Sequence, residues 1–286
     1  MITATFQIAP GFGARRELRL WQAGVVHWAA YETSGVRLPR PADAALRAAI
    51  DAASAAHAAG DVARLAALLP AGEHWRLFQA FGADAAYLDI ETSDDVVGFA
   101  GISAIGVLDR RGPRLLLAGR DLHCFPELAR RWSLLVTFNG SSFDVPILRR
   151  AFPEWEPPRA HIDLRHVLGR LGLVGGLKAI ERRVSALHRS PALHLTRPDH
   201  LAGLDGGDAG WLFRRGRDGD RAALCRFAEY NLYDVINLRT LTAYAYNALV
   251  DVQTKYAPAV RIGMPCVPVP GRGDVLYDVS KILLGL

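Results

Sequence analysis

The sequence predicts an α/β fold: a mixed sheet with helices on both faces, preceded by a helical extension. Two observations support this prediction. Residues 1–80 are rich in alanine and other helix formers, and from residue 83 onward short apolar runs typical of buried strands alternate with helical stretches. The order strand, strand, strand, helix, strand, helix, followed by further helices, is typical of a mixed sheet covered on both sides.

The region 1–80 is predicted to be helical because PADAALRAAIDAASAAHAAGDVARLAALL contains few helix breakers. The segment that starts it, APGFGARRELRLWQAGV, resembles half of a helix-hairpin-helix, in which backbone N–H groups hold a phosphate without reading sequence. Arg15 and Arg16 would then contact a nucleic-acid backbone. The alternative is a structural turn that begins a packing helix.

The main domain is expected to span residues 83–250. Its strands are predicted at 85–91, 96–108, 114–119 and 133–138, and helices are predicted in DLHCFPELARRW, in DVPILRRAF and through most of the chain up to Ala248. Residues 188–220, rich in Gly, Asp, Arg and Pro, are expected to be loosely structured. The Pro- and Gly-rich tail, 251–286, is expected to be extended and to pack on the domain.

Composition limits the class of protein. Half of the 286 residues are hydrophobic, yet no apolar run approaches the ~18 residues that cross a bilayer, and the first residues lack the pattern of a signal peptide. Three scattered cysteines favour a reduced, cytoplasmic protein without a structural zinc site. The net charge of +5, supplied mainly by arginine, fits phosphate binding but is equally explained by codon bias.

Four acidic residues stand out by their context. Asp89 and Glu91, two apart on a predicted strand, point to the same face; Asp144 follows a second buried strand, and Asp234 lies in a helical stretch. Taken singly, they could be a strand end, a helix N-cap and a solvated helix face. Taken together in apolar surroundings, they would repel one another and need compensating cations.

Magnesium or manganese would supply that charge, since both ions prefer oxygen ligands. Two such ions held roughly 3.5–4 Å apart suit in-line attack on a phosphodiester. Tyr230, four residues before Asp234, shares its helical face and could position the attacking water. The alternative is a core tyrosine whose hydroxyl is satisfied by the backbone.

The segments DIE, NGSSFD and YNLYD, in that order, resemble the three motifs of the DEDD (DnaQ-like) 3′→5′ exonucleases, tyrosine subclass. The flanking segments EHWRLFQAF and HIDLRHVLGRLGLVGGLKAIERRV make the chain most similar to the YprB-type ribonuclease-H-like proteins. The resemblance covers residues 83–248. It implies a ribonuclease-H-like fold with a mixed five-stranded sheet.

The resemblance also implies roles for individual residues. Two Mg²⁺ or Mn²⁺ ions would be held by Asp89, Glu91, Asp144 and Asp234, with Tyr230 as the water-positioning residue. Asn139, at a strand end in the second motif, would contact the substrate. Phe143 would support the same motif from the core. Lys178, near a helix start, is a candidate phosphate contact, with a solvated lysine as the alternative.

The function predicted from the sequence is a metal-dependent 3′→5′ exonuclease that acts on single-stranded DNA or RNA ends. Two alternatives stay open: a non-catalytic nucleic-acid-binding or scaffold protein on the same fold, and a structure-specific endonuclease.

The motif that begins with DIE continues as ETSDD, where relatives often carry threonine and glycine. Asp94 and Asp95 are therefore expected in a solvated turn rather than at a metal.

Overall fold

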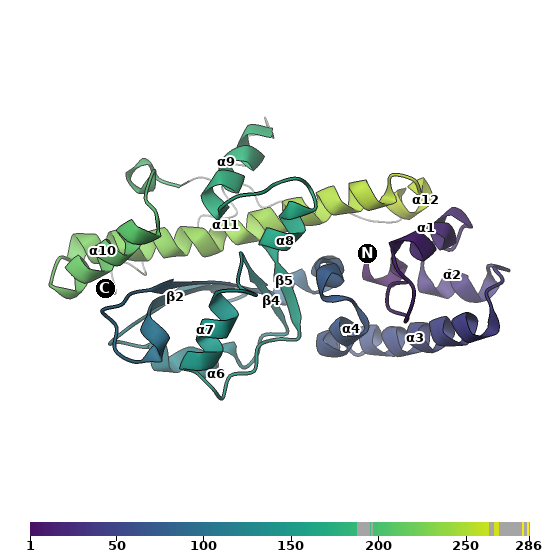
Figure 1. Cartoon of the computed structure of the whole chain (residues 1–286), viewed down its shortest axis with the longest axis horizontal. Coiled ribbons are helices and arrows are strands. Elements are labelled where there is room, and N and C mark those ends of the chain that lie inside the picture. The colour runs from purple at the N-terminus through teal and green to yellow at the C-terminus, as the bar shows by residue number, and fades with distance from the viewer. Residues whose placement is uncertain (188–194, 196, 263–265, 269–281, 283–284, 286) are drawn as a thin grey trace.

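The computed structural model describes residues 1–187, 195, 197–262, 266–268, 282 and 285. Five strands form one mixed sheet in the order β3-β2-β1-β4-β5 (Figure 1). Strands β1, β4 and β5 run parallel, whereas β2 and β3 are antiparallel to their neighbours. The predicted mixed five-stranded sheet with helices around it is therefore confirmed.

The strands are β1 Ala86–Thr92, β2 Ile102–Asp109, β3 Gly112–Leu117, β4 Leu134–Thr137 and β5 Ala160–Asp163. The helices are α1 Ala14–Gln22, α2 Trp28–Thr33, α3 Arg40–Ala58, α4 Val62–Leu68, α5 Phe78–Phe81, α6 Phe125–Ala129, α7 Asp144–Ala151, α8 Leu164–Gly169, α9 Leu177–Leu187, α10 Gly206–Arg217, α11 Arg221–Thr254 and α12 Pro258–Ile262. Short 3₁₀ segments, among them Ala71–Leu77, connect some of these elements.

The alternation of side chains along β1 separates the two layers of the core. Leu88 and Ile90 face a cluster formed with α6 and α7, whereas Tyr87 joins the cluster on the opposite face, which includes much of α11. Since successive strand residues point to opposite faces, Asp89 and Glu91 lie on the face that α11 covers. The strand that anchors the core thus also presents two carboxylates beneath α11.

Helix α11 is the longest element and runs along most of the molecule (Figure 1). Its 34 residues correspond to a length of about 51 Å at 1.5 Å per residue. It contacts strands β1 to β4 and the helices α8, α9, α10 and α12. Asp220 caps its first turn by accepting a hydrogen bond from the N–H of Ala223 at 3.0 Å. Such a helix fixes the positions of its side chains relative to the sheet.

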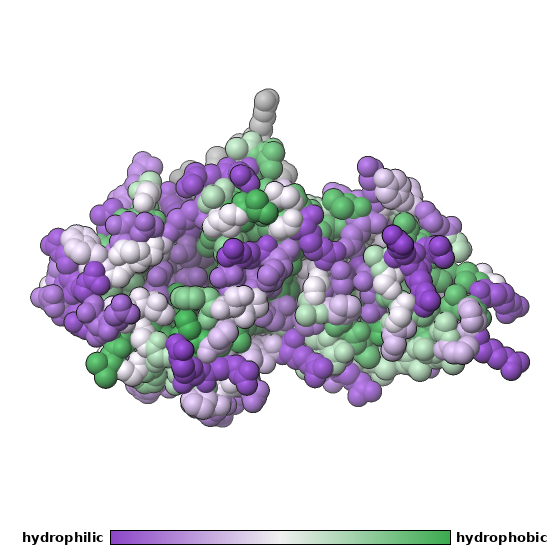
Figure 2. All heavy atoms as spheres, viewed as in Figure 1, coloured by the Kyte–Doolittle hydropathy of each residue, from purple (hydrophilic) through white to green (hydrophobic). Residues whose placement is uncertain are grey.

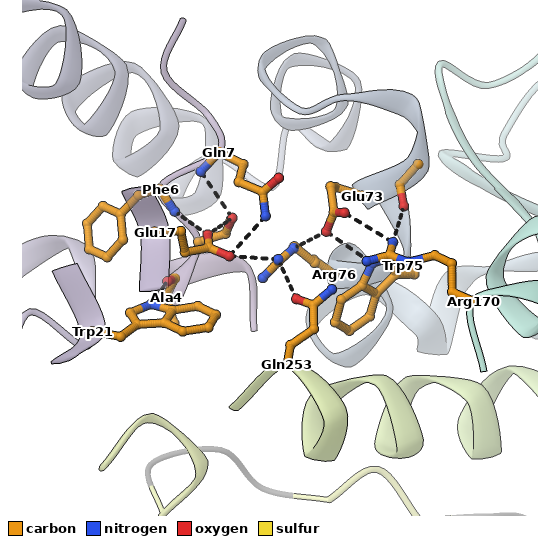
Figure 3. A network of polar contacts seen from close by, with 12 residues as sticks. Ala4, Phe6, Gln7, Glu17, Trp21, Glu73, Trp75, Arg76, Arg170 and Gln253 are labelled. Carbon is orange, nitrogen blue, oxygen red and sulfur yellow. Dashed lines mark hydrogen bonds and ion pairs between the residues drawn. The ribbon is translucent and has the colours of Figure 1, made fainter. Parts of the chain in front are cut away.

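The N-terminal region packs into the same hydrophobic cluster as one face of the sheet and the second half of α11. A buried polar network reinforces this contact (Figure 3). Nη2 of Arg76 donates to Oε1 of Glu17 at 2.8 Å and to Gln253 of α11 at 2.6 Å, and Nε donates to Glu73 at 2.5 Å. Backbone and side-chain donors from Phe6 and Gln7 also reach Glu17.

Several sequence predictions about elements were wrong in detail, including the helical structure expected where strand β5 forms. The second strand begins at Ile102 instead of residue 96, because the chain turns at Gly101 (φ +80°) before it enters the sheet. Helix α10 lies within the range expected to be loose; Asp205 forms a capping box with Asp208 at its start. The predicted helix in DLHCFPELARRW is a short 3₁₀ turn followed by the five-residue α6.

Some predictions fall largely outside the described residues. These are the part of the loose region at 188–194 and most of the tail expected to be extended. Within the tail, residues 251–254 still belong to α11, and α12 follows.

The end of the molecule that carries α10 is covered largely by hydrophilic residues (Figure 2). Over the described parts of the chain, no helix is both long and apolar enough to cross a bilayer.

We predict that Arg76→Ala lowers the free energy of unfolding by about 3–5 kcal/mol, because it leaves the buried carboxylate of Glu17 without its cation. Arg47→Ala is the matched control, since the ion pair of Arg47 with Asp43 is solvent-exposed and should contribute far less. Urea unfolding followed by circular dichroism measures both. Equal losses in the two variants would contradict a stabilising role for the buried network.

Candidate metal centre

Three carboxylates meet at the interface of β1 and α11. Asp89, Glu91 and Asp234 each offer an oxygen, and the three oxygens lie within 4.8 Å of one another. Asp234 is buried, whereas Asp89 and Glu91 are partly exposed along one edge of the cluster. Residues distant in the sequence therefore form a compact group of oxygen donors.

Asp144 lies next to this group, at the first turn of α7. Its carboxylate accepts a hydrogen bond from the backbone N–H of Ile90 at 3.0 Å, which ties α7 to β1. Asp144 is buried, and its charge contributes to the raised pKa of Asp89. It is close to the three clustered acids but not part of the group whose oxygens lie within 4.8 Å of one another.

The loop that carries Asp144 is held by Asp163 at the end of β5. Asp163 accepts hydrogen bonds from the backbone N–H groups of Asn139 at 2.7 Å and Ser141 at 3.0 Å. It also caps α8 by accepting a hydrogen bond from the N–H of Arg165 at 3.1 Å. Asn139 adopts a left-handed backbone conformation (φ +66°), which turns the chain at the end of β4 toward Asp144.

Burial disfavours the charged forms of all four acids, and repulsion from neighbouring acids of the group adds to this effect for Asp89 and Glu91. Burial first, and then the charges of Asp234, Asp144 and Glu91, raise the pKa of Asp89 well above its usual value. Burial and the charge of Asp234 raise the pKa of Glu91 to about 8, and burial raises the pKa of Asp144 to about 7. Burial also raises the pKa of Asp234, although the guanidinium of Arg197 opposes the shift.

Two cations face the acids. Arg197 contacts Oδ1 of Asp234 through Nη2 and also pairs with Glu181, through Nε and Nη2, at 2.9 Å each. Lys178 in the first turn of α9 has a lowered pKa because burial disfavours its charge, while Asp234 and Glu91 act in the opposite direction. Since Arg197 is shared with Glu181, the four acids keep an excess of negative charge.

Tyr230 lies one helical turn before Asp234 on α11 and is buried. Its hydroxyl oxygen accepts a hydrogen bond from Nζ of Lys178, which also lies 3.9 Å from the centroid of the ring. Burial and the charges of Asp234 and Glu91 raise its pKa, so the phenol keeps its proton. The hydroxyl is therefore held by a side chain at the acid cluster and not by the backbone.

Asn231, which sequence reasoning missed, orients Asp89. Nδ2 of Asn231 donates to Oδ2 of Asp89 at 2.9 Å, and Asn231 is fully buried. The close approach depends on Gly106, opposite Asp89 in β2, because a Cβ atom at Gly106 would collide with Oδ1 of Asn231. A glycine inside a strand can signal such a close approach, and Gly106 stands within the apolar run of β2.

The remaining predicted residues lie elsewhere or differ from expectation. Arg15 and Arg16 are exposed on α1, and the structure does not bring them to the acid cluster; the guanidinium of Arg16 lies 5.5 Å from the centroid of the Phe12 ring. Phe143 was expected in the core but is 42% exposed, because the next residue, Asp144, takes the inward direction at the start of α7.

The turn after β1 agrees with the solvated position expected for it. Asp94 is exposed, and Asp95 pairs with Arg214 of α10 at 3.4 Å. The backbone carbonyl of Asp95 also accepts a hydrogen bond from Arg217 at 3.0 Å. These contacts connect the turn to α10 instead of to the acid cluster.

The donors fit divalent metal ions. All the candidate ligands are carboxylate oxygens, which suit Mg²⁺ and Mn²⁺, and their raised pKa values show that the charged forms are disfavoured by burial and by neighbouring acids. Asp89, Glu91 and Asp234 could share an ion, and Asp144 could complete a second position beside them. A hard cation would favour the charged forms of these groups.

Comparison with known proteins gives one match. The family model of the RNase H superfamily matches residues 86–246, more than half of the chain. This range contains the whole sheet and all four acids. Searches of curated proteins and of solved structures gave no match.

Gly106→Ala is predicted to lower the free energy of unfolding by about 1–3 kcal/mol, because the added methyl group displaces the buried side chain of Asn231. Gly169→Ala at the end of α8 is the control, since a Cβ atom there meets nothing within 4 Å. Urea unfolding measures both variants. A Gly106→Ala protein as stable as the control would show that Asn231 does not need this space.

In the presence of EDTA, stability is predicted to fall as the pH rises from about 4 toward 8. Folding raises the pKa of Glu91 from 4.5 to about 8 and that of Asp144 from 3.8 to about 7, so the folded state binds more protons. This contribution to stability is fully present at pH values below the pKa values of the unfolded state. It is lost as the pH rises through the pKa values of the folded state.

Glu91→Gln should therefore raise the melting temperature at pH 8.5, by about 2–4 °C for each kcal/mol of repulsion removed, and should have little effect at pH 4. Asp94→Asn, on the exposed turn nearby, is the matched control and should change neither value. Differential scanning calorimetry at both pH values makes the comparison. A lower melting temperature for Glu91→Gln at pH 8.5 would contradict the proposed repulsion.

Proposed function

Because the chain belongs to the RNase H superfamily, we propose that it is a metal-dependent nuclease, most simply a 3′→5′ exonuclease acting on single-stranded DNA or RNA ends. The observation that carries the proposal is the convergence of Asp89, Glu91 and Asp234, with oxygens within 4.8 Å of one another, beside Asp144. The order of the three motifs supports placement in the tyrosine subclass of the DEDD exonucleases, near the YprB-type proteins.

In this proposal Asp89, Glu91, Asp144 and Asp234 hold two Mg²⁺ or Mn²⁺ ions. When bound, the ions would supply Lewis acidity toward water and toward the phosphate oxygens. Asn231 orients Asp89 through its hydrogen bond of 2.9 Å, and the N–H of Ile90 orients Asp144. These contacts keep the ligands in place before substrate arrives, which limits reorganisation during the reaction.

Tyr230 would position the attacking water through its hydroxyl. The hydrogen bond from Lys178 fixes the oxygen as an acceptor on one side and directs the phenol proton elsewhere, toward an acceptor in the site. Because burial and nearby acids raise the pKa of Tyr230, the phenol acts as a donor and not as a base. Lys178 would also offer positive charge to a phosphate.

Two other functions would use the same site. A non-catalytic nucleic-acid-binding or scaffold protein is less well supported, because all four acids are retained and hydrogen bonds hold Asp89 and Asp144. A structure-specific endonuclease would need the same metals but no strand end. We also propose a cytoplasmic location, on the basis of the three scattered cysteines.

Asp89→Asn and Asp234→Asn are predicted to lower the rate of hydrolysis by about 100-fold or more, since each removes a negatively charged metal ligand worth several kcal/mol in the transition state. Tyr230→Phe should lower it less, by about tenfold, through loss of one hydrogen bond. Asp94→Asn is the control and should keep full activity. Wild-type rates in either ligand variant would rule the assignment out.

The wild-type protein is predicted to shorten end-labelled single-stranded oligonucleotides in the presence of Mg²⁺ or Mn²⁺, giving a ladder from the 3′ end and releasing nucleoside 5′-monophosphates. Parallel reactions with DNA and with RNA oligonucleotides identify the preferred type of nucleic acid. Circular single-stranded DNA is the control, because an exonuclease needs an end. Cleavage of the circle would favour an endonuclease, and binding without cleavage of any substrate would favour the scaffold protein.

A further inference from the structure

A cavity of about 390 Å³ lies next to the acid cluster, lined by α9 on one side and by Leu195, Arg197 and 201–203 on the other. Its lining includes three cations, one carboxylate and two leucines: Lys178, Arg182, Arg197, Glu181, Leu195 and Leu201. Lys178 and Arg197 are also the cations that act on the candidate metal ligands. The cavity and the metal centre therefore share a wall.

Arg197 in this wall has an unused donor. Its Nε and Nη2 are bound to Glu181 and Asp234, but Nη1 is buried and has no hydrogen-bond partner. The side chain is only 10% exposed, and nearly all buried N–H groups in proteins have an acceptor. A guanidinium held by a bidentate carboxylate, with one NH₂ group left over, is suited to a further oxygen ligand.

The charge of the cavity favours an anion. Glu181 is engaged by Arg197 and by Nδ2 of Asn237 at 3.0 Å, so its carboxylate is already satisfied. Lys178, which is half-buried, and Arg182, which is exposed at the surface, remain as positive charge in the lining. Phosphate oxygens match both the fork of an arginine and the point charge of a lysine.

We propose that this cavity is a subsite for a backbone phosphate of the nucleic-acid strand, bound by Arg197, Lys178 and Arg182, with Leu195 and Leu201 beside the attached sugar. The inference rests on the proposed nuclease function, because it places the strand at the acid cluster. The guanidinium of Arg197 and Nζ of Lys178 donate to the phosphate oxygens, and the exposed Arg182 adds positive charge. Strand binding here would set which linkage reaches the metal centre.

Binding of a fluorescein-labelled decathymidylate to the full chain, followed by anisotropy in EDTA, tests the subsite without hydrolysis. Arg197→Gln and Arg182→Gln should each weaken the affinity, by about tenfold for Arg197, and should reduce the dependence of the affinity on salt by about 0.7 in log–log slope. Arg183→Gln is the matched control. This variant removes a positive charge from α9, the helix that also carries Arg182. Arg183 does not line the cavity, and it donates to the carbonyl of Val174 at 3.2 Å.

Unchanged affinity in both Arg197→Gln and Arg182→Gln, or an equal loss in Arg183→Gln, would overturn the proposal. If Arg197→Gln does not fold, because Glu181 loses its cation, the exposed Arg182→Gln decides. Hydrolysis of the oligonucleotide by the wild type in Mg²⁺ is measured separately. Hydrolysis with unchanged affinities would reject the subsite alone, and affinity losses without any hydrolysis would reject the nuclease alone.

Discussion

Repulsion among four acidic side chains at one end of β1 is the constraint on which the rest of the structure depends. Each carboxylate is partly or fully removed from water, and the charges of neighbouring acids add to the cost of charging Asp89 and Glu91. Isolated in a flexible chain, such groups would separate. The fold keeps them together because the core that packs β1 against α11 on one face and against α7 on the other is extensive. The packing offsets the repulsion.

The rigidity of α11 is central to this arrangement. The helix carries Tyr230, Asn231 and Asp234 within little more than one turn, so a single element delivers a phenol, an amide and a carboxylate to the same edge. Its far end is fixed by the contact of Gln253 with Arg76, inside the buried network of the N-terminal region. A region remote from the metal centre thereby stabilises the helix on which the centre is built.

The sequence predicted four of the five strands and the grouping of Asp89, Glu91 and Asp234 for physical reasons, whereas β5 lies in a stretch expected to be helical. Buried strands appear as short apolar runs, and Asp89 and Glu91 share a face through the two-residue period of a strand. The first residue of β2 was not predictable from apolarity alone, because the residues before Gly101 are equally apolar. Helix α10 was not predicted because its sequence contains several glycines, although Asp205 and Asp208 form a recognisable capping box.

Contacts that depend on three-dimensional approach were missed. Asn231 stands beside Tyr230 in the sequence, yet nothing in its spacing identifies Asp89 as its partner; the glycine opposite, Gly106, was the available signal. Arg197 lies in a stretch without periodicity, so its pairing with Glu181 and Asp234 could only come from the folded chain. Conversely, the family resemblance implied a core position for Phe143, whereas the turn into α7 exposes it.

Calorimetric titration of the protein with Mn²⁺ tests the central claim most directly. If the four acids form a metal centre, the wild type binds two Mn²⁺ ions per chain, and Asp89→Asn loses that binding while Asp94→Asn, on the exposed turn, retains it. Wild-type protein that takes up no Mn²⁺, or Asp89→Asn protein that binds as the wild type does, would contradict the account.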